Sequence, residues 1–154
     1  MKTLLKIVSV AALASAMVAP VASAENFKDE VKTRKAHMQV VKYNMGILAG
    51  MAKGKREYDS ALADAAANNM LKLSSMNNMA LWPKGSDNEA LGDKTKAKPA
   101  IWAADSKIGE KHQAWAKASE NMATVAGQGL DDLRQAMGPL GKSCKGCHSD
   151  YKAK

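Results

Sequence analysis

The last quarter of the chain carries the most regular apolar pattern of the sequence. Its apolar side chains recur every three or four residues, at Leu130, Leu133, Met137, Leu140, Cys144, Cys147 and Tyr151. This spacing predicts an α-helix that buries one face against other helices. The only two cysteines of the chain lie on that face, so whatever they bind has to sit at a seam between helices. Pro139 has no amide hydrogen, and we therefore expect a kink or a break in the helix there.

Three further stripes of the same kind precede this one, over residues 31–52, 62–76 and 101–126. Lys53-Gly54-Lys55 is typical of a helix end, and Asp59 or Ser60 suits a helix start. The third helix should begin near Ile101, just after Pro99. No segment alternates as a strand does. The sequence therefore predicts an all-α fold.

The connections between the stripes predict how the helices are arranged. Those between the first and second stripes and between the third and fourth are short, whereas residues 82–99 form a long connection with two prolines and two glycines. Short connections join antiparallel neighbours. We therefore expect an up-down-up-down four-helix bundle with a long loop between helices 2 and 3.

The first 24 residues differ from the rest of the chain. Two lysines precede an apolar stretch over residues 7–18, and the segment ends in Ala22-Ser23-Ala24. This pattern is typical of a cleaved secretory signal, the alternative being an uncleaved anchor. We expect cleavage after residue 24, a single domain over residues 25–154 and, since no other apolar stretch approaches 20 residues, no insertion into the membrane afterwards.

The chain is basic, with a formal net charge of +8, of which the two lysines of the signal contribute +2. Export and the mixing of lysines with acids along the chain argue against a nucleic-acid partner. An acidic protein partner fits better. No constellation of acid, base and nucleophile indicates an enzyme.

Cys144, Cys147 and His148 form a C-x-x-C-H motif, the attachment signature of c-type haem. Two thiols add to the vinyl groups of one porphyrin, and the adjacent imidazole becomes an axial ligand of the iron. A zinc site would need four ligands, and the chain offers only His37 and His112 besides. A redox disulfide is the other alternative, but no strand precedes the motif as in thioredoxin-like folds. The motif favours one covalent haem c.

Arg34 is a charge on the otherwise apolar stripe of the first helix. A buried arginine needs an anionic partner, and a haem propionate is one, the alternative being a side chain that reaches solvent. Only "SDYKAK" follows His148, and it offers no second axial ligand, so we expect an upstream helix to close the opposite face of the haem.

A terminal C-x-x-C-H on the last helix of a small exported four-helix bundle resembles the cytochrome c′ family, the class II c-type cytochromes. The resemblance lies in "RKAHMQVVKYNMGILAGMAKGKREYD", "KPAIW" and "LDDLRQAMGPLGKSCKGCHSDYK". It implies that the first helix supplies the residue over the distal face of the haem, which falls on Met38. It also implies a periplasmic location and, in many members, a homodimer. Many members carry arginine at the position of Lys152.

The family resemblance leaves two functions open. In some members the iron stays five-coordinate and binds nitric oxide or carbon monoxide, and in others a methionine of the first helix is the sixth ligand of an electron carrier. We expect an electron carrier with Met38 and His148 as ligands and an unidentified redox partner. His37, turned about 100° from Met38, should be a flank or surface residue. His112 should be a hydrogen-bonded core histidine.

Overall fold

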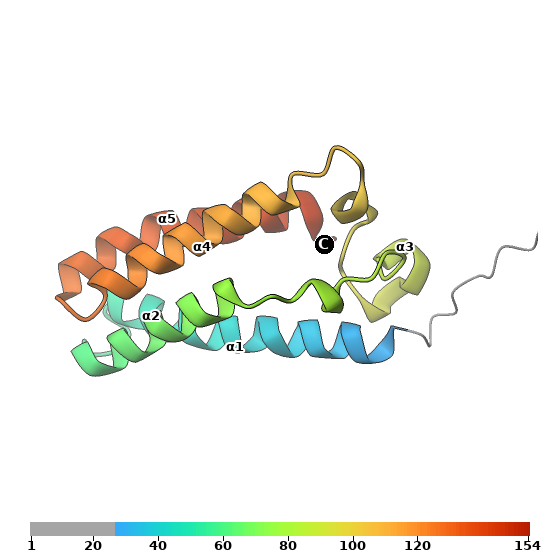
Figure 1. Ribbon diagram of the computed structural model, residues 1–154. Coiled ribbons are helices and arrows are strands. Elements are labelled where there is room, and N and C mark those ends of the chain that lie inside the picture. Colours follow the sequence, from blue (N-terminus) through green and yellow to red (C-terminus); the bar gives the residue numbers. More distant parts are fainter. Residues whose placement is uncertain (1–26) are drawn as a thin grey trace, which may run out of the picture.

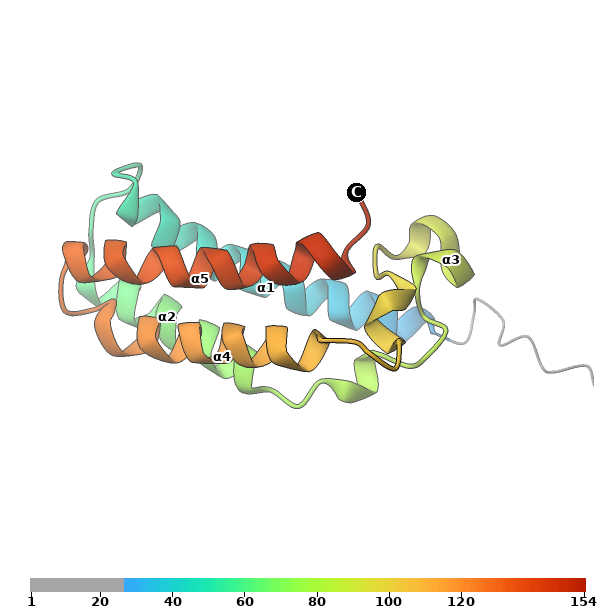
Figure 2. The same ribbon diagram turned by 90° about the horizontal axis from the view of Figure 1, so that it is seen from above.

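The computed structural model describes residues 27–154, so the predicted signal at residues 1–24 lies outside the described residues. Four long helices form the body of the protein: α1 (Lys28–Ala52), α2 (Ser60–Ser75), α4 (Ile108–Val125) and α5 (Leu130–Tyr151). Each packs against two others, in the order α1, α2, α4, α5 and back to α1. Figures 1 and 2 show α5 over α1 and α4 over α2, with successive long helices running in opposite directions. The predicted up-down-up-down bundle is confirmed.

The connection between α2 and α4 contains only short helical turns. These are η1 (Met79–Leu81), α3 (Asn88–Leu91), η2 (Gly92–Lys94) and η3 (Pro99–Trp102). The prediction of a long helix starting at Ile101 is wrong, because α4 begins at Ile108. Trp102 donates a hydrogen bond from Nε1 to the backbone oxygen of Trp82 at 2.9 Å, which holds this stretch within the connection. No helix in the described part of the chain is long and apolar enough to cross a membrane.

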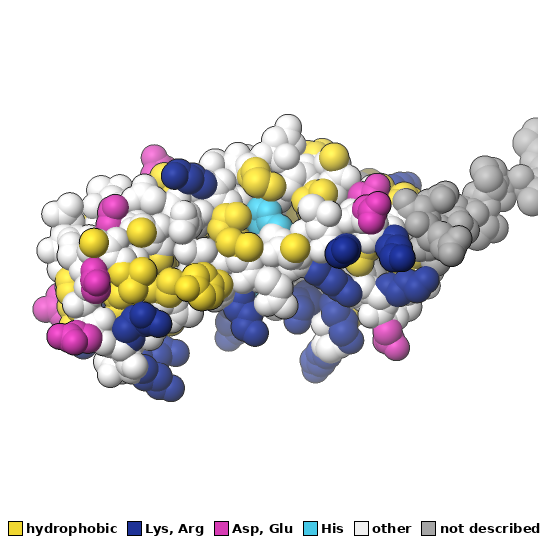
Figure 3. All heavy atoms as spheres, turned by 90° about the horizontal axis from the view of Figure 1, so that it is seen from below, with side chains coloured by type: hydrophobic (Ala, Val, Ile, Leu, Met, Phe, Trp, Pro, Cys, Tyr) yellow, Lys and Arg dark blue, Asp and Glu magenta, His cyan; other side chains and the backbone are white. Residues whose placement is uncertain are grey.

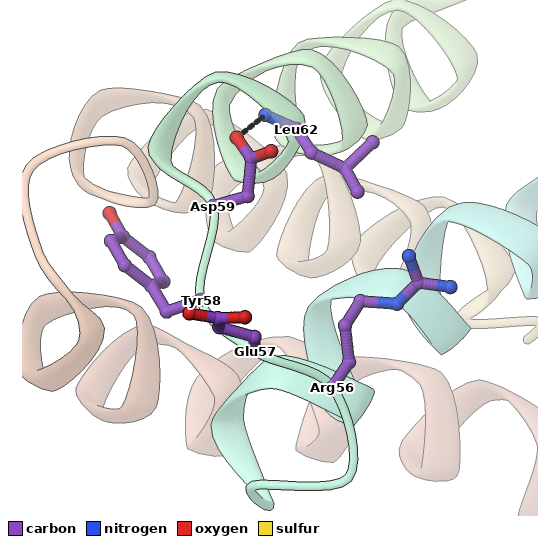
Figure 4. A pocket seen from close by; sticks show the side chains of 5 residues that line it. All are labelled: Arg56, Glu57, Tyr58, Asp59 and Leu62. Carbon is purple, nitrogen blue, oxygen red and sulfur yellow. Dashed lines mark hydrogen bonds between the residues drawn. The ribbon is translucent and has the colours of Figure 1, made fainter.

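The turns at one end of the bundle are tied to each other. Asp59 caps α2 as predicted, accepting a hydrogen bond from the amide of Leu62 at 2.9 Å (Figure 4). The Tyr58 hydroxyl donates to the oxygen of Ala126 at 3.0 Å, and the Ser60 hydroxyl donates to the oxygen of Gly127 at 2.6 Å. These bonds join the α1–α2 turn to the α4–α5 turn and close this end of the molecule. The surface hollow in Figure 4 belongs to this closed end.

The dry core lies next to the closed end. Its large side chains with almost no exposed surface are Leu48, Met51, Met70, Met122, Leu133 and Leu140. Further along the same stripes of α1 and α5, burial drops around Met38 and His148 and returns at Arg34, Val31 and Tyr151. In Figure 1 the α1–α2 pair and the α4–α5 pair diverge toward the end that holds the C-terminus. The core therefore fixes one end of the bundle and leaves the other end more open.

Helix α5 runs without interruption through Pro139, so of the expected kink or break, the break is wrong. Proline cannot donate to the carbonyl of Gln135, four residues earlier. Both residues are exposed, so water can hydrogen-bond the freed carbonyl. Solvent thus replaces the missing bond, and the helix continues to the C-x-x-C-H motif.

Replacing this proline should stabilise the protein. Pro139→Ala restores a helical hydrogen bond and should raise the free energy of unfolding by about 2–3 kcal/mol, measured by urea denaturation of the holoprotein. The matched control is Gly138→Ala, whose added Cβ meets no atom within 4 Å and should contribute only about 0.5–1 kcal/mol. Equal gains from the two variants would show that Pro139 costs the helix nothing.

Candidate functional site

Cys144 and Cys147 lie one helical turn apart near the end of α5. Both thiols are free and half-buried. Burial raises the pKa of both thiols, and for Cys147 the nearby Lys111 opposes this only in part. The thiol form is therefore favoured, whereas metal binding and disulfide exchange require the thiolate. The described residues contain no group of three or more His, Cys, Asp or Glu side chains that could hold a metal ion. The zinc and redox-disulfide alternatives therefore lack support.

His148 follows Cys147 directly and shares a helix face with Cys144, four residues earlier. Its side chain is largely exposed toward the open end of the bundle. Partial burial, and then the positive charge of Lys152, lower the pKa of its imidazole. The neutral imidazole, which is the form that binds iron, is thereby favoured.

The register between α1 and α5 brings Met38 opposite His148. Near the closed end, Arg134 of α5 donates from Nε to the backbone oxygen of Ala52, the last residue of α1, at 3.1 Å. Met38 lies fourteen residues before Ala52, and His148 lies fourteen residues after Arg134. Because the two helices are antiparallel and rise equally per residue, these two side chains lie at about the same level of the bundle.

The seam between α1 and α5 at the level of Met38 and His148 is the candidate place for a flat prosthetic group. Met38 belongs to the inward side of α1, yet 37% of its surface is exposed, whereas Leu48 on the same side is fully buried. On α5 burial falls in the same direction, from Leu140 to His148. Burial returns beyond this level, at Val31, Arg34 and Tyr151, so the exposed stretch of the α1–α5 seam is confined to the level of Met38 and His148. Cys144, Cys147 and His148 would hold a haem there, with Met38 on the opposite side.

Arg34 is only 4% exposed and is held by the connection between α2 and α4. Its two terminal nitrogens donate to the backbone oxygens of Leu81 and Ser86 and to the hydroxyls of Ser86 and Thr95, the two hydroxyl contacts measuring 2.7 Å each. Its guanidinium also lies 4.7 Å from the ring centre of Trp82. Desolvation lowers its pKa, opposed by the charges of Asp87 and Glu30. Arg34 thus anchors the connection between α2 and α4. Its contact with a haem propionate stays a prediction, and the Nε–H group of Arg34 is the donor left for that contact.

His37 is buried, so its prediction as a flank or surface residue is wrong. It is 8% exposed, and its ring lies 6.3 Å from that of Trp115 on α4. His112 lies 5.7 Å from the same indole ring. Burial, and then the charge of His112, lower the pKa of His37. The sequence stripe was centred on Met38. Helix α1 packs against both α2 and α5, so its buried surface is wider than that stripe and includes His37.

Several buried polar atoms around Trp115 have no hydrogen-bond partner among the described residues. They are Nδ1 and Nε2 of His37, Nε2 of His112, Nε1 of Trp115 and Oγ of Ser119. The expectation that His112 is a hydrogen-bonded core histidine is therefore not met at Nε2. The spacing of His112, Trp115 and Ser119 on one helix face was visible in the sequence, but their meeting with His37 depends on the packing of α1 against the bundle.

A four-helix bundle whose last helix carries two free, half-buried thiols and an adjacent imidazole is the arrangement of a monohaem c-type cytochrome. The family pattern described as cytochrome C′ matches residues 29–152. Cytochrome c-554 of Cereibacter sphaeroides is 34% identical over 141 residues, which are 90% of each chain. The chain belongs to the cytochrome c′ family, whose members bind haem c covalently.

Solved structures agree with this assignment. Cytochrome c′ from Rhodobacter sphaeroides superposes with a TM-score of 0.79 at 34% identity, covering 86% of this chain and 99% of that one. A ferrous variant of cytochrome c′ from Alcaligenes xylosoxidans with bound nitric oxide superposes with a TM-score of 0.71 at 30% identity, covering 86% and 98%. The four-helix arrangement of this chain is therefore that of its relatives.

Removing the arginine anchor should destabilise the protein. Arg34→Ala leaves the hydroxyls of Ser86 and Thr95 without their donor and uncovers Trp82, so we expect a loss of about 2–4 kcal/mol in the free energy of unfolding of the holoprotein. The control is Lys32→Ala, which removes an exposed cation from the same helix and should change stability by less than about 0.5 kcal/mol. A loss no greater than that of the control would contradict the anchoring role.

Proposed function

We propose that this protein is a periplasmic one-electron carrier whose haem is attached through Cys144 and Cys147, with His148 and Met38 as the axial ligands. One observation carries the proposal: Met38 on α1 and His148 on α5 lie at the same height along the bundle. Each lies fourteen residues from the hydrogen bond that joins Ala52 and Arg134. The haem iron supplies one-electron redox chemistry, and a methionine opposite a histidine favours a raised potential.

Two features of the chain support the proposal further. Met38 has a flexible thioether that can adapt its position beside the α1–α5 seam. The secretory pattern of residues 1–24 supports cleavage and a periplasmic location, where the domain over residues 25–154 would acquire its haem.

The competing function is gas binding by a five-coordinate iron, in which Met38 only shields the distal side. It is favoured by the exposure of Met38, which no contact holds in a ligating position, and by the relative with bound nitric oxide. The two functions differ in whether the thioether occupies the sixth position.

A homodimer through α1 is a further part of the proposal. Val40 and Tyr43 on this helix are 48% and 70% exposed, and large apolar side chains on one outer helix face favour a partner. Sedimentation equilibrium of the holoprotein tests it. Tyr43→Lys should then shift the equilibrium toward monomer, and a wild-type protein that is monomeric at all concentrations would contradict it.

The absorption spectrum of the reduced holoprotein tests the ligation. We expect a low-spin spectrum that carbon monoxide does not change. Met38→Ala should convert the haem to high spin and allow carbon monoxide to bind, because the sixth position is then open. Met45→Ala, one heptad further along α1, is the matched control and should leave the spectrum low-spin. A high-spin wild-type spectrum that shifts with carbon monoxide would instead assign the protein to the gas-binding class.

A further inference from the structure

Two pairs of lysines bracket the two proposed axial ligands with identical spacing. On α1, Lys35 lies three residues before Met38 and Lys42 lies four residues after it. On α5 and its C-cap, Lys145 lies three residues before His148 and Lys152 lies four residues after it. Seven residues make two helical turns, so the lysines of each pair lie on the same flank of their helix.

The same register that aligns the ligands also aligns the lysines. Lys42 lies ten residues before Ala52 and Lys145 eleven residues after Arg134, so these two lysines are nearly level across the α1–α5 seam. Lys35 and Lys152 correspond in the same way, seven residues and therefore about two turns nearer the open end. All four side chains are exposed. We call Lys35, Lys42, Lys145 and Lys152 the lysine frame.

Lys152 shows that the frame lies close to the site. It lies four residues, about one helical turn, after His148 and directly follows the last residue of α5. Its backbone is also fixed, because residue 152 forms an isolated antiparallel bridge with Ala97. This end of the frame is therefore held against the connection that covers the open end.

Few acidic side chains lie near the frame on either helix, Asp150 beside Lys152 being the nearest on α5. The chain has no acid between Glu30 and Glu57, and none between Asp132 and Asp150. The nearest acid on α5, Asp150, forms a salt bridge of 2.9 Å with Lys111 of α4, on the side away from α1. Figure 3 views the molecule from below and shows Lys and Arg side chains gathered along the lower edge of the picture, with few acids among them.

The other two helices carry balanced charge. On α2 the charged residues are Asp64 and Lys72, and on α4 they are Glu110, Lys111, Lys117 and Glu120. Helix α1 carries five cations and two acids, and α5 with its C-cap Lys152 carries four cations and three acids, so the excess positive charge of the half that holds Met38 and His148 lies mainly on α1. A uniformly solubilising surface would show no such preference.

We propose that the lysine frame is the docking surface for an acidic electron-transfer protein. This inference rests on the proposed electron-carrier function, because a partner must bring its redox group near the seam where the haem-holding residues approach the surface. Complementary charge raises the association rate and selects the orientation of the encounter. A second copy of this chain does not fit on the frame itself, because it would place lysines against lysines, and the proposed dimer contact at Val40 and Tyr43 lies on another flank of α1.

Paramagnetic mapping tests where an anion binds, whatever the ligation of the iron. The probe is hexacyanochromate(III), added to the ¹⁵N-labelled reduced holoprotein. We expect the amide signals of residues around Lys35, Lys42, Lys145 and Lys152 to broaden first. Broadening that is spread evenly over the surface, or centred on Lys72 and Lys117, would overturn the proposal.

Kinetics with a protein probe test whether the frame guides a partner. The probe is an acidic flavodoxin in its hydroquinone form, mixed with the oxidised holoprotein in a stopped-flow instrument. Lys35→Glu/Lys42→Glu should lower the second-order rate by about tenfold or more at low ionic strength, and the difference should vanish at high salt. The matched control, Lys72→Glu/Lys117→Glu, changes the net charge equally on α2 and α4 and should lower the rate by less than about threefold.

The outcomes separate the docking surface from the proposed function. Equal losses from the two double variants would show that only net charge matters and would overturn the proposal. Binding to phosphatidylglycerol vesicles that is lost in Lys35→Glu/Lys42→Glu, without an effect on the flavodoxin rate, would assign the frame to a lipid surface and likewise overturn it. A carbon monoxide-sensitive spectrum would contradict the ligation alone, since the chromium map does not depend on it.

Discussion

The register of α1 against α5 is the constraint on which the site depends. It is set far from the motif, where the hydroxyls of Tyr58 and Ser60 join the two turns and Arg134 bonds to the end of α1. A dry core of leucine, methionine and alanine side chains then prevents the helices from sliding, because a shift of one residue would move these side chains out of their contacts. Met38 and His148 are brought level by packing that lies three to four helical turns away.

The open end needs a different kind of support, because the bundle has no dry core there. The connection between α2 and α4 provides this support through Arg34. The Arg34 guanidinium donates four hydrogen bonds to that segment, at Leu81, Ser86 and Thr95, and lies over the ring of Trp82. The C-terminus contributes as well, since the amide of Lys98 donates to the oxygen of Tyr151 at 3.0 Å and that of Ala153 to the oxygen of Lys96 at 2.8 Å. A long connection that would otherwise move freely is thus fixed beside the haem-holding residues.

Most of the architecture could be predicted from local signals. The apolar stripes predicted the helices, and Gly54 and Asp59 predicted the end of α1 and the start of α2, because these residues act within one turn of the chain. The helix expected from Ile101 failed because Trp102 is held by a distant backbone oxygen at Trp82, a contact that no local pattern records. Pro139 did not break α5 because its face is exposed, and exposure is a property of the packed bundle. For the same reason the burial of His37 and the anchoring contacts of Arg34 could not be read from spacing alone.

The most direct test of the central claim is the methyl spectrum of the reduced holoprotein labelled with ¹³C-methyl methionine. A methionine bound to the iron places its methyl group over the porphyrin ring, whose ring current displaces that signal far from the others. The account predicts one strongly displaced methyl signal, and Met38→Leu should remove it while the remaining methionine signals stay in place. The absence of a displaced signal, or its persistence in Met38→Leu, would contradict the alignment of Met38 with His148.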